Sequence, residues 1–231
     1  MSTPMPTSNT AGRPPARRGQ ARTRLARAAV VDAARTLFVE RGFGATTIEA
    51  ISDLADVPPA TVYRLFSSKR GILKSVLDMS IAGDADAVPM AERPHVRALL
   101  ADPDPRSQVA GLVAVTSDVN SRTAAIYGVL AGAASSDPDV AALLDDQNRQ
   151  RATGQGRVVR ALARGGALRP GVRERDAVDI TYALLSPEMY RLLVGDRGWP
   201  PGRYERWLTD TLVERILPSP GGSRASGAGN A

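Results

Sequence analysis

The residues with the clearest chemical capacity lie close together near the N-terminus, and their chemistry is contact with phosphate. Between residues 57 and 77 the charged side chains are all basic, namely Arg64, Lys69, Arg70 and Lys74. No carboxylate in this stretch competes with them, as binding to a polyanion requires. The stretch therefore predicts a surface that binds nucleic acid.

A helix that begins near Pro59 would bring several of these side chains onto one surface. Proline fits the first turn of a helix, because its missing N–H would have no helical partner there. Val62 and Phe66 are four residues apart and can face a core. The opposite face of this helix then carries Ala60, Thr61, Tyr63 and Arg64.

Two further helices are expected to position it. Residues 22–41 have apolar side chains at helical spacing, and Gly42 provides a stop. Thr46 and Glu49 match a capping box at the start of a short second helix, and a tight turn follows before Pro59. Two short helices joined by such a turn have the proportions of a helix-turn-helix, although spacing alone also allows a chance pattern in a small helical protein.

A fourth helix is expected after Ser67 or Ser68, with Lys69 and Arg70 in its first turn. Positive side chains are unfavourable at a helix N-terminus. An anion bound there would explain them.

The order of residues is more specific than their spacing. Residues 40–48 read ERGFGATTI and residues 55–69 read ADVPPATVYRLFSSK. Over residues 24–78 the chain resembles the DNA-binding region of TetR-type bacterial transcriptional repressors. The resemblance implies an all-α protein with an N-terminal three-helix head, which holds the helix-turn-helix, and a larger C-terminal helical bundle. It also implies a homodimer that binds a palindromic operator in double-stranded DNA and is released by a small molecule.

The resemblance also implies roles for single residues. Thr47 would approach a phosphate through its hydroxyl and backbone N–H, Tyr63 would reach the sugar-phosphate backbone, and Lys69 would meet another phosphate. Ala60, Thr61 and Arg64 would lie near base edges. The chain departs from the family pattern at Asp56, Pro58, Leu65 and Arg70, positions where the family usually has Gly, Ser, His and Glu. The resemblance therefore does not predict the operator sequence.

The positive charge is concentrated at the N-terminus. The net charge is +6, and six arginines precede the first acidic residue, Asp32: Arg13, Arg17, Arg18, Arg22, Arg24 and Arg27. Residues 1–21 are rich in proline and poor in large apolar side chains, so we expect a disordered basic arm. The arm either contacts DNA or only adds solubility. Residues 218–231 have a similar composition and predict a disordered tail.

Beyond a helix-turn-helix domain at residues 22–80, residues 81–217 predict an effector-binding and dimerisation domain. Its helices are expected at residues 94–101, 105–134, 138–164, 176–194 and 201–216. In the second of these, Thr116, Thr123 and Tyr127 share the inward stripe with apolar residues. They are candidate contact residues for a lipophilic effector. Alternatively, the threonines bond their own helix and the tyrosine reaches the rim.

The last two predicted helices carry long apolar stripes. One stripe consists of Tyr182, Leu185, Met189, Leu192 and Leu193, and the other of Tyr204, Trp207, Leu208, Leu212 and Ile216. A two-fold four-helix interface would bury them in a homodimer. Alternatively, both stripes only close the core of one chain.

The composition argues against several other functions. The chain has no cysteine and a single histidine, His95, so thiolate zinc sites and most nucleophilic catalysis are poor candidates. We expect no enzyme, metal or cofactor. No apolar stretch or leader sequence suggests a membrane partner, and we expect a cytoplasmic protein. The alternatives are a helical small-molecule-binding protein or enzyme, and a constitutive architectural DNA-binding protein.

Overall fold

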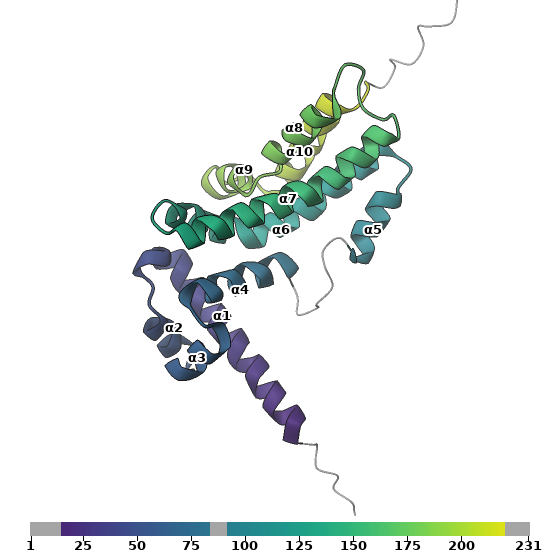
Figure 1. Ribbon diagram of the computed structural model, residues 1–231. Coiled ribbons are helices and arrows are strands. Elements are labelled where there is room, and N and C mark those ends of the chain that lie inside the picture. The colour runs from purple at the N-terminus through teal and green to yellow at the C-terminus, as the bar shows by residue number, and fades with distance from the viewer. Residues whose placement is uncertain (1–14, 84–91, 220–231) are drawn as a thin grey trace, which may run out of the picture.

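The computed structural model describes residues 15–83 and 92–219, and these residues form helices without a strand (Figure 1). The head contains α1 (Pro15–Ala45), α2 (Ile48–Ala55), α3 (Pro59–Phe66) and α4 (Lys69–Ala82). The body contains α5 (Pro94–Ala101), α6 (Pro105–Ala134), α7 (Pro138–Arg164), α8 (Glu174–Leu184), α9 (Pro187–Tyr190), a π-helix (Arg191–Asp196) and α10 (Pro201–Ile216). The predicted all-α class is confirmed.

The start of α1 differs from the prediction. The helix begins at Pro15 instead of residue 22, so residues 15–21 are helical and not part of a disordered arm. Proline suits a first turn, and the following alanines, arginines and glutamine have good helix propensity. The predicted arm up to residue 14, with Arg13, and the predicted tail from residue 220 lie outside the described residues.

Gly42 ends the regular part of α1 as expected. Its φ of 78° and ψ of 167° lie in a region that glycine alone adopts readily, and they kink the helix before its last residues. The kink turns Phe43 back toward Phe38, and the two ring centroids are 5.6 Å apart. The chain can thus reverse direction and start α2 against α1.

The predicted capping box at the start of α2 is wrong by one residue. Thr47 is the N-cap, and its side-chain oxygen accepts a hydrogen bond from the N–H of Ala50. Thr46 is fully buried instead, and its hydroxyl donates to the carbonyl oxygens of Leu37 at 3.2 Å and Gly42 at 2.8 Å. Thr46 therefore fastens the α1–α2 turn, while Thr47 stays exposed.

The turns around α3 form as the sequence predicts. Asp56 adopts the left-handed conformation, with φ 51° and ψ 43°, and Pro58 precedes α3 without a side-chain cap. Ser68 caps α4 by accepting from the N–H of Gly71. Val62 and Phe66 are buried, so the orientation of α3 follows the expected pattern.

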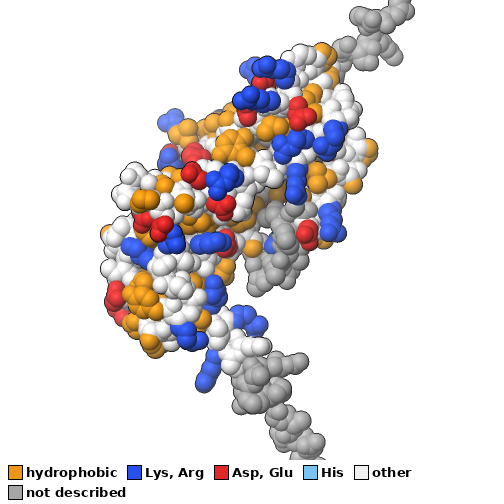
Figure 2. Space-filling view, viewed as in Figure 1, with side chains coloured by type: hydrophobic (Ala, Val, Ile, Leu, Met, Phe, Trp, Pro, Cys, Tyr) orange, Lys and Arg blue, Asp and Glu red, His pale blue; other side chains and the backbone are white. Residues whose placement is uncertain are grey.

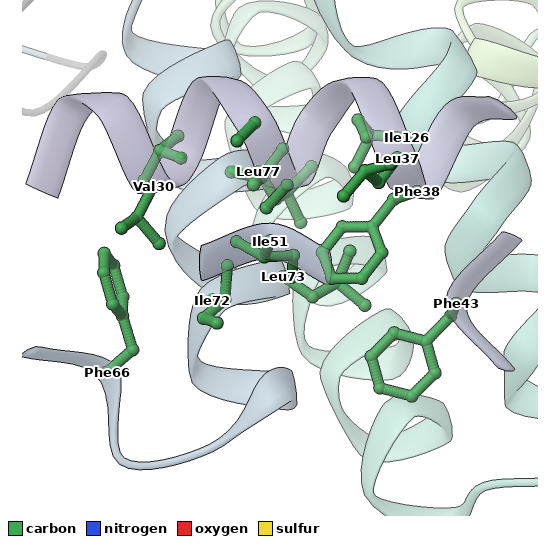
Figure 3. Packing of buried hydrophobic residues seen from close by; sticks show 14 of the residues in the cluster. Val30, Leu37, Phe38, Phe43, Ile51, Phe66, Ile72, Leu73, Leu77 and Ile126 are labelled. Carbon is green, nitrogen blue, oxygen red and sulfur yellow. The ribbon is translucent and has the colours of Figure 1, made fainter. Parts of the chain in front are cut away.

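The apolar core of the head continues into the body (Figure 3). Phe38 of α1, Ile51 of α2 and Leu73 of α4 pack in one cluster with Ile126 of α6. The same cluster includes Tyr127, Leu130, Val140 and Leu143 from α6 and α7. α1 and α4 of the head are therefore anchored directly on the two long helices of the body.

The body is built around α6 and α7, which lie side by side along most of their lengths (Figure 1). α8 packs on α7, and α10 packs on α6. Leu185, Tyr204, Leu208, Leu212 and Ile216 are almost completely buried in this second core. These five residues close the core of one chain, so for this half of the two predicted stripes the dimer interface is wrong and the alternative holds.

The helix predicted at residues 176–194 is interrupted at Pro187, a residue that is expected to bend it. α8 ends at Leu184, Ser186 caps α9, and Pro187 occupies the first turn of α9. Proline cannot donate the hydrogen bond that a continuous helix would need. Leu192 lies in the π-helix beyond the break and is 47% exposed. Among the described helices, none is long and apolar enough to cross a membrane.

Candidate DNA-binding surface and effector cavity

The outer face of α3 is the candidate DNA-binding surface. Ala60 and Arg64 are exposed, Thr61 is half-buried, and the ring of Tyr63 is 48% exposed. The inner face holds α3 in place through Val62 and Phe66. The structure thus brings together four of the residues that the sequence assigned to DNA contact.

Thr47 lies at the start of α2 and is exposed. Its oxygen accepts the capping hydrogen bond from Ala50 at 3.1 Å. A hydroxyl that accepts one hydrogen bond can still donate its proton. Capping and a phosphate contact are therefore compatible at Thr47.

Lys69 is placed differently from the expectation. Its ammonium donates to the carbonyl oxygens of Phe43 at 2.8 Å and Thr46 at 2.9 Å, and it lies 4.3 Å from the centroid of the Phe43 ring. Two of its three donors are already used within the chain. A phosphate contact through this side chain has one N–H left.

The neighbouring Arg70 also has a partner in the chain. It forms an ion pair with Asp139 at 2.7 Å, which links α4 to the first turn of α7. Carbonyl oxygens and a carboxylate therefore balance the two cations at the start of α4. The bound anion that the sequence suggested is not needed to explain them.

Arg27 is a positioning residue that the sequence reading missed. From α1 it donates to the carbonyl oxygen of Leu65 at 3.1 Å and to the hydroxyl of Ser75 at 3.2 Å. Its guanidinium also lies 4.6 Å from the centroid of the Phe66 ring. Arg27 thus joins the end of α3 to α4, a role that its place in a run of arginines concealed.

Basic side chains continue along α1 away from this junction. Arg22 and Arg24 are exposed. Figure 2 shows Lys and Arg side chains on the part of α1 that projects from the molecule. These charges extend the basic surface beyond α3.

A cavity of about 480 Å³ lies in the body between α5, α6, α7 and α9. Thr116, Thr123 and Tyr127 line it, so the structure brings together the three predicted effector residues. Thr123 donates to the carbonyl oxygen of Val119 at 2.9 Å, which is the local bond considered as the alternative. Tyr127 is 6% exposed, and burial raises the pKa of its phenol to about 12.

The opposite wall carries polar residues that the sequence reading did not select. Gln147, Arg151 and Gln155 are spaced by four along α7 and line the cavity, as does Asn120 of α6. A test of which α7 face remains apolar could have found them, since α7 must pack on α6 as well as α8.

The cavity reaches the head through α4. Ile81, near the end of α4, lines it. Arg122 of α6 donates to the carbonyl oxygen of Ser80 at 3.0 Å and pairs with Asp118 at 2.6 Å. From α1, Arg35 donates to the carbonyl oxygen of Arg122 at 3.2 Å. The wall of the cavity and the helix that follows α3 are therefore in direct contact.

Comparison with known proteins agrees with this arrangement. Residues 30–76 match the family model described as bacterial regulatory proteins, tetR family. The uncharacterized HTH-type transcriptional regulator YdeS of Bacillus subtilis (strain 168) is 26% identical over 184 residues, which are 77% of this chain and 83% of YdeS.

Solved structures share the fold. A putative transcriptional regulator from Saccharomonospora viridis in complex with choline aligns with a TM-score of 0.62 and 20% identity, over 83% of this chain and 97% of that one. The SmeT–triclosan complex aligns with a TM-score of 0.62 and 17% identity, over 89% and 99%. The family match over residues 30–76 and the HTH-type relative support a TetR-type transcriptional regulator, and the solved structures show that the fold is shared.

Proposed function

We propose that the protein is a repressor that binds a palindromic operator as a homodimer and is released by a small molecule. The observation that carries the DNA-binding part is the outer face of α3, where Thr61, Tyr63 and Arg64 stand outward on a helix firmly held from behind. A recognition helix needs a compact outer face, without competing carboxylates, to enter the major groove. Ala60 contributes a small side chain that lets the backbone approach the bases.

In this proposal Arg64 and Thr61 read base edges, while Tyr63 and Thr47 contact the backbone. Lys69 contributes its remaining N–H to a phosphate. Phosphate contacts set the register of the protein on DNA, whereas base contacts carry sequence preference. Arg22 and Arg24 on the projecting part of α1 add positive charge beside the same duplex.

The homodimer would use the outer faces of α8 and α10 instead of the buried stripe. Ile180 and Leu184 of α8 and Val213 of α10 are partly buried against the core, and the part that stays exposed offers apolar surface to a second copy. A two-fold interface here would present two copies of α3 to successive turns of DNA. The proposed division at residues 80 and 81 separates the DNA-binding part from this dimerising part.

Release would follow from the contact between the cavity and α4. A ligand that fits the cavity in one arrangement of α4 shifts the population toward that arrangement. Ile81 and the Arg122 contact to Ser80 are the points where the shift would reach the head. The apolar part of the cavity lining favours a lipophilic effector. The SmeT and Saccharomonospora viridis structures hold triclosan and choline, respectively.

Selection of bound sequences from a random duplex library tests the proposal. We expect a palindrome with two half-sites, and affinity for it above affinity for random duplex. Arg64→Ala should weaken operator binding by about tenfold or more. Arg164→Ala removes an exposed arginine at the far end of α7 and should leave binding unchanged. Equal affinity for all duplexes would favour the architectural alternative, and no duplex binding at low ionic strength would refute the proposal.

A further inference from the structure

Two rows of polar side chains line the effector cavity from opposite helices. α6 contributes Thr116, Asn120, Thr123 and Tyr127, and α7 contributes Gln147, Arg151 and Gln155. Asn120 is 2% exposed, Gln147 3% and Gln155 7%. Burial of amides is costly unless they are hydrogen-bonded. Such a concentration of polar groups in a helical core is expected where a ligand completes their bonding.

The chain itself completes only part of that bonding. The side-chain N–H groups of Asn120 and Gln155 both point to one acceptor, the carbonyl oxygen of Leu185, at 3.2 Å and 3.5 Å. Arg151 donates through Nη1 to the carbonyl oxygen of Tyr182 at 2.9 Å. Arg151 Nε and Gln155 Oε1 are buried without a hydrogen-bond partner. Each unpartnered atom is a cost that a ligand could remove.

The charges around the cavity have one sign. Arg149, Arg151 and Arg157 line it, and its described lining includes no Asp or Glu. Arg149 is paired with Asp146 at 3.3 Å outside the lining. The guanidinium of Arg151 stacks 3.7 Å from the centroid of the Tyr182 ring, and no described carboxylate forms an ion pair with it. An anion is favoured in such a field, and a cation is disfavoured.

Tyr127 adds a donor on the other wall. Its phenol is buried, burial raises its pKa to about 12, and it carries its proton at neutral pH. The nearby charge of Arg151 acts on this phenol, as does the negative charge of the exposed Glu188 on α9, which does not line the cavity. Tyr127 on α6 and Arg151 on α7 line the same cavity, so one ligand group placed between the two helices can meet both.

We propose that the effector is a lipophilic carboxylic acid bound as its anion, with the carboxylate at Arg151 and Tyr127. The inference rests on the proposed function of the cavity and names the class of molecule it takes. The carboxylate would accept from Arg151 Nε and from the Tyr127 hydroxyl.

The apolar body of the ligand has its own place in the cavity. Val96 and Leu99 of α5 and Val115 and Val119 of α6 line the part of the cavity walls that is free of charge. An alkyl chain or ring system there would bury apolar area on both sides. The ligand is therefore amphipathic, with one anionic end.

Three probes with the same ten-carbon chain test the head group: decanoate, 1-decanol and decyltrimethylammonium. Binding to the full chain, without DNA, is measured by isothermal titration calorimetry below the aggregation limit of each probe. We expect decanoate to bind about tenfold or more tightly than decanol, because it makes charge-assisted hydrogen bonds. Decyltrimethylammonium should bind weakest. Decanol or the ammonium probe binding as tightly as decanoate would overturn the inference.

Variants then locate the carboxylate. Arg151→Met should reduce decanoate affinity about tenfold or more and leave decanol affinity nearly unchanged. Arg164→Met is the matched control and should change neither. If Arg151→Met fails to fold, Tyr127→Phe provides a second reading, since it removes one donor and should weaken decanoate more than decanol. Unchanged decanoate binding in a folded Arg151→Met or Tyr127→Phe variant would overturn the assignment.

The two proposals fail separately. Absence of decanoate binding in a protein that still binds its selected operator overturns the carboxylate inference alone. Absence of operator binding in a protein that binds decanoate as described overturns the proposed repressor function and leaves the carboxylate site standing.

Discussion

The head and the body treat buried polar groups in opposite ways. In the head, Thr46, Ser52 and Lys69 all bond to backbone carbonyl oxygens of neighbouring turns. Among residues 19–83, every buried side-chain nitrogen or oxygen has a partner. In the body, Gln155 Oε1, Thr181 Oγ1 and Tyr204 Oη are buried without one.

The difference distinguishes the head, whose structure is fixed by its own hydrogen bonds, from the body, which can bind a ligand. A fully bonded polar group fixes the geometry around it, whereas an unbonded one destabilises the free protein. In the proposed function, the head must hold α3 in one orientation relative to α1 and α4 whether or not a ligand is bound. The body contains both the cavity and the unpartnered atoms, so ligand binding can change its free energy more than that of the head.

Replacement of Phe38 should give the largest effect, because it removes a ring from the core shared by α1, α2 and α4. Phe38 is fully buried, so Phe38→Ala should lower the free energy of unfolding by about 3–5 kcal/mol. Val39→Ala is the matched control, since Val39 is 47% exposed on the next position of α1. Urea denaturation measures both variants, and equal losses would contradict the packing described for the head.

The same substitution at two threonines tests the comparison directly. Thr46→Val removes a hydroxyl that bonds two carbonyl oxygens, and it should cost about 1–3 kcal/mol. Thr181→Val removes a buried hydroxyl without a partner, and it should leave stability unchanged or raise it. Denaturant midpoints of the two variants measure the difference. A larger loss at Thr181 would reverse the contrast between head and body.

Alkaline pH should act on the body through its buried phenols. The pKa of Tyr127 is raised from 10.0 to about 12, and burial also raises the pKa values of Tyr190 and Tyr204. The unfolded chain therefore releases phenol protons first, and stability falls as pH rises from about 10 toward 12. Below pH 10 this contribution is constant.

Tyr127→Phe should make that alkaline loss smaller by about 1–2 kcal/mol, after allowance for partial solvent access. Denaturation at pH 8 and at pH 11 measures it, with Tyr63→Phe as the control for an exposed phenol. A loss that is identical in the wild type and in Tyr127→Phe would show that this phenol ionises freely in the folded protein.

The smallest effect is expected at the ion pair that joins the two parts. Arg70 and Asp139 are 47% and 72% exposed, so Asp139→Asn should lower stability by less than about 1 kcal/mol. Asp146→Asn breaks an ion pair within α7 and serves as the control. Thermal unfolding in low and high salt compares them. A loss of several kcal/mol would mean that this pair holds the head in place.

Helix positions were the part that the sequence could predict well. The bounds of α5, α6, α7 and α10 agree with the expectation, because a proline occupies the first turn of each. Local rules of this kind need no knowledge of the rest of the fold. The exposed face of α3 followed from Val62 and Phe66 in the same way.

Features that depend on distant partners could not be predicted. Lys69 reaches the carbonyl oxygens of Phe43 and Thr46, more than twenty residues earlier, and no local pattern indicates this contact. The stripe that includes Tyr204 and Leu208 reads equally well as an interface or as a core, and only the position of α6 and α8 decides. The polar row of α7 was missed for a similar reason, since spacing does not tell which neighbour a face meets.

The cluster that joins Phe38 and Leu73 to Ile126 and Leu130 has a consequence for recombining such regulators. A chimera that exchanges residues 1–83 alone would set a foreign set of side chains against α6. The contact between the head and α6 could then contain cavities or steric clashes, even if each parent protein folds well. Grafts that carry the matching surfaces of α6 and α7 along with the head should yield usable hybrids more often.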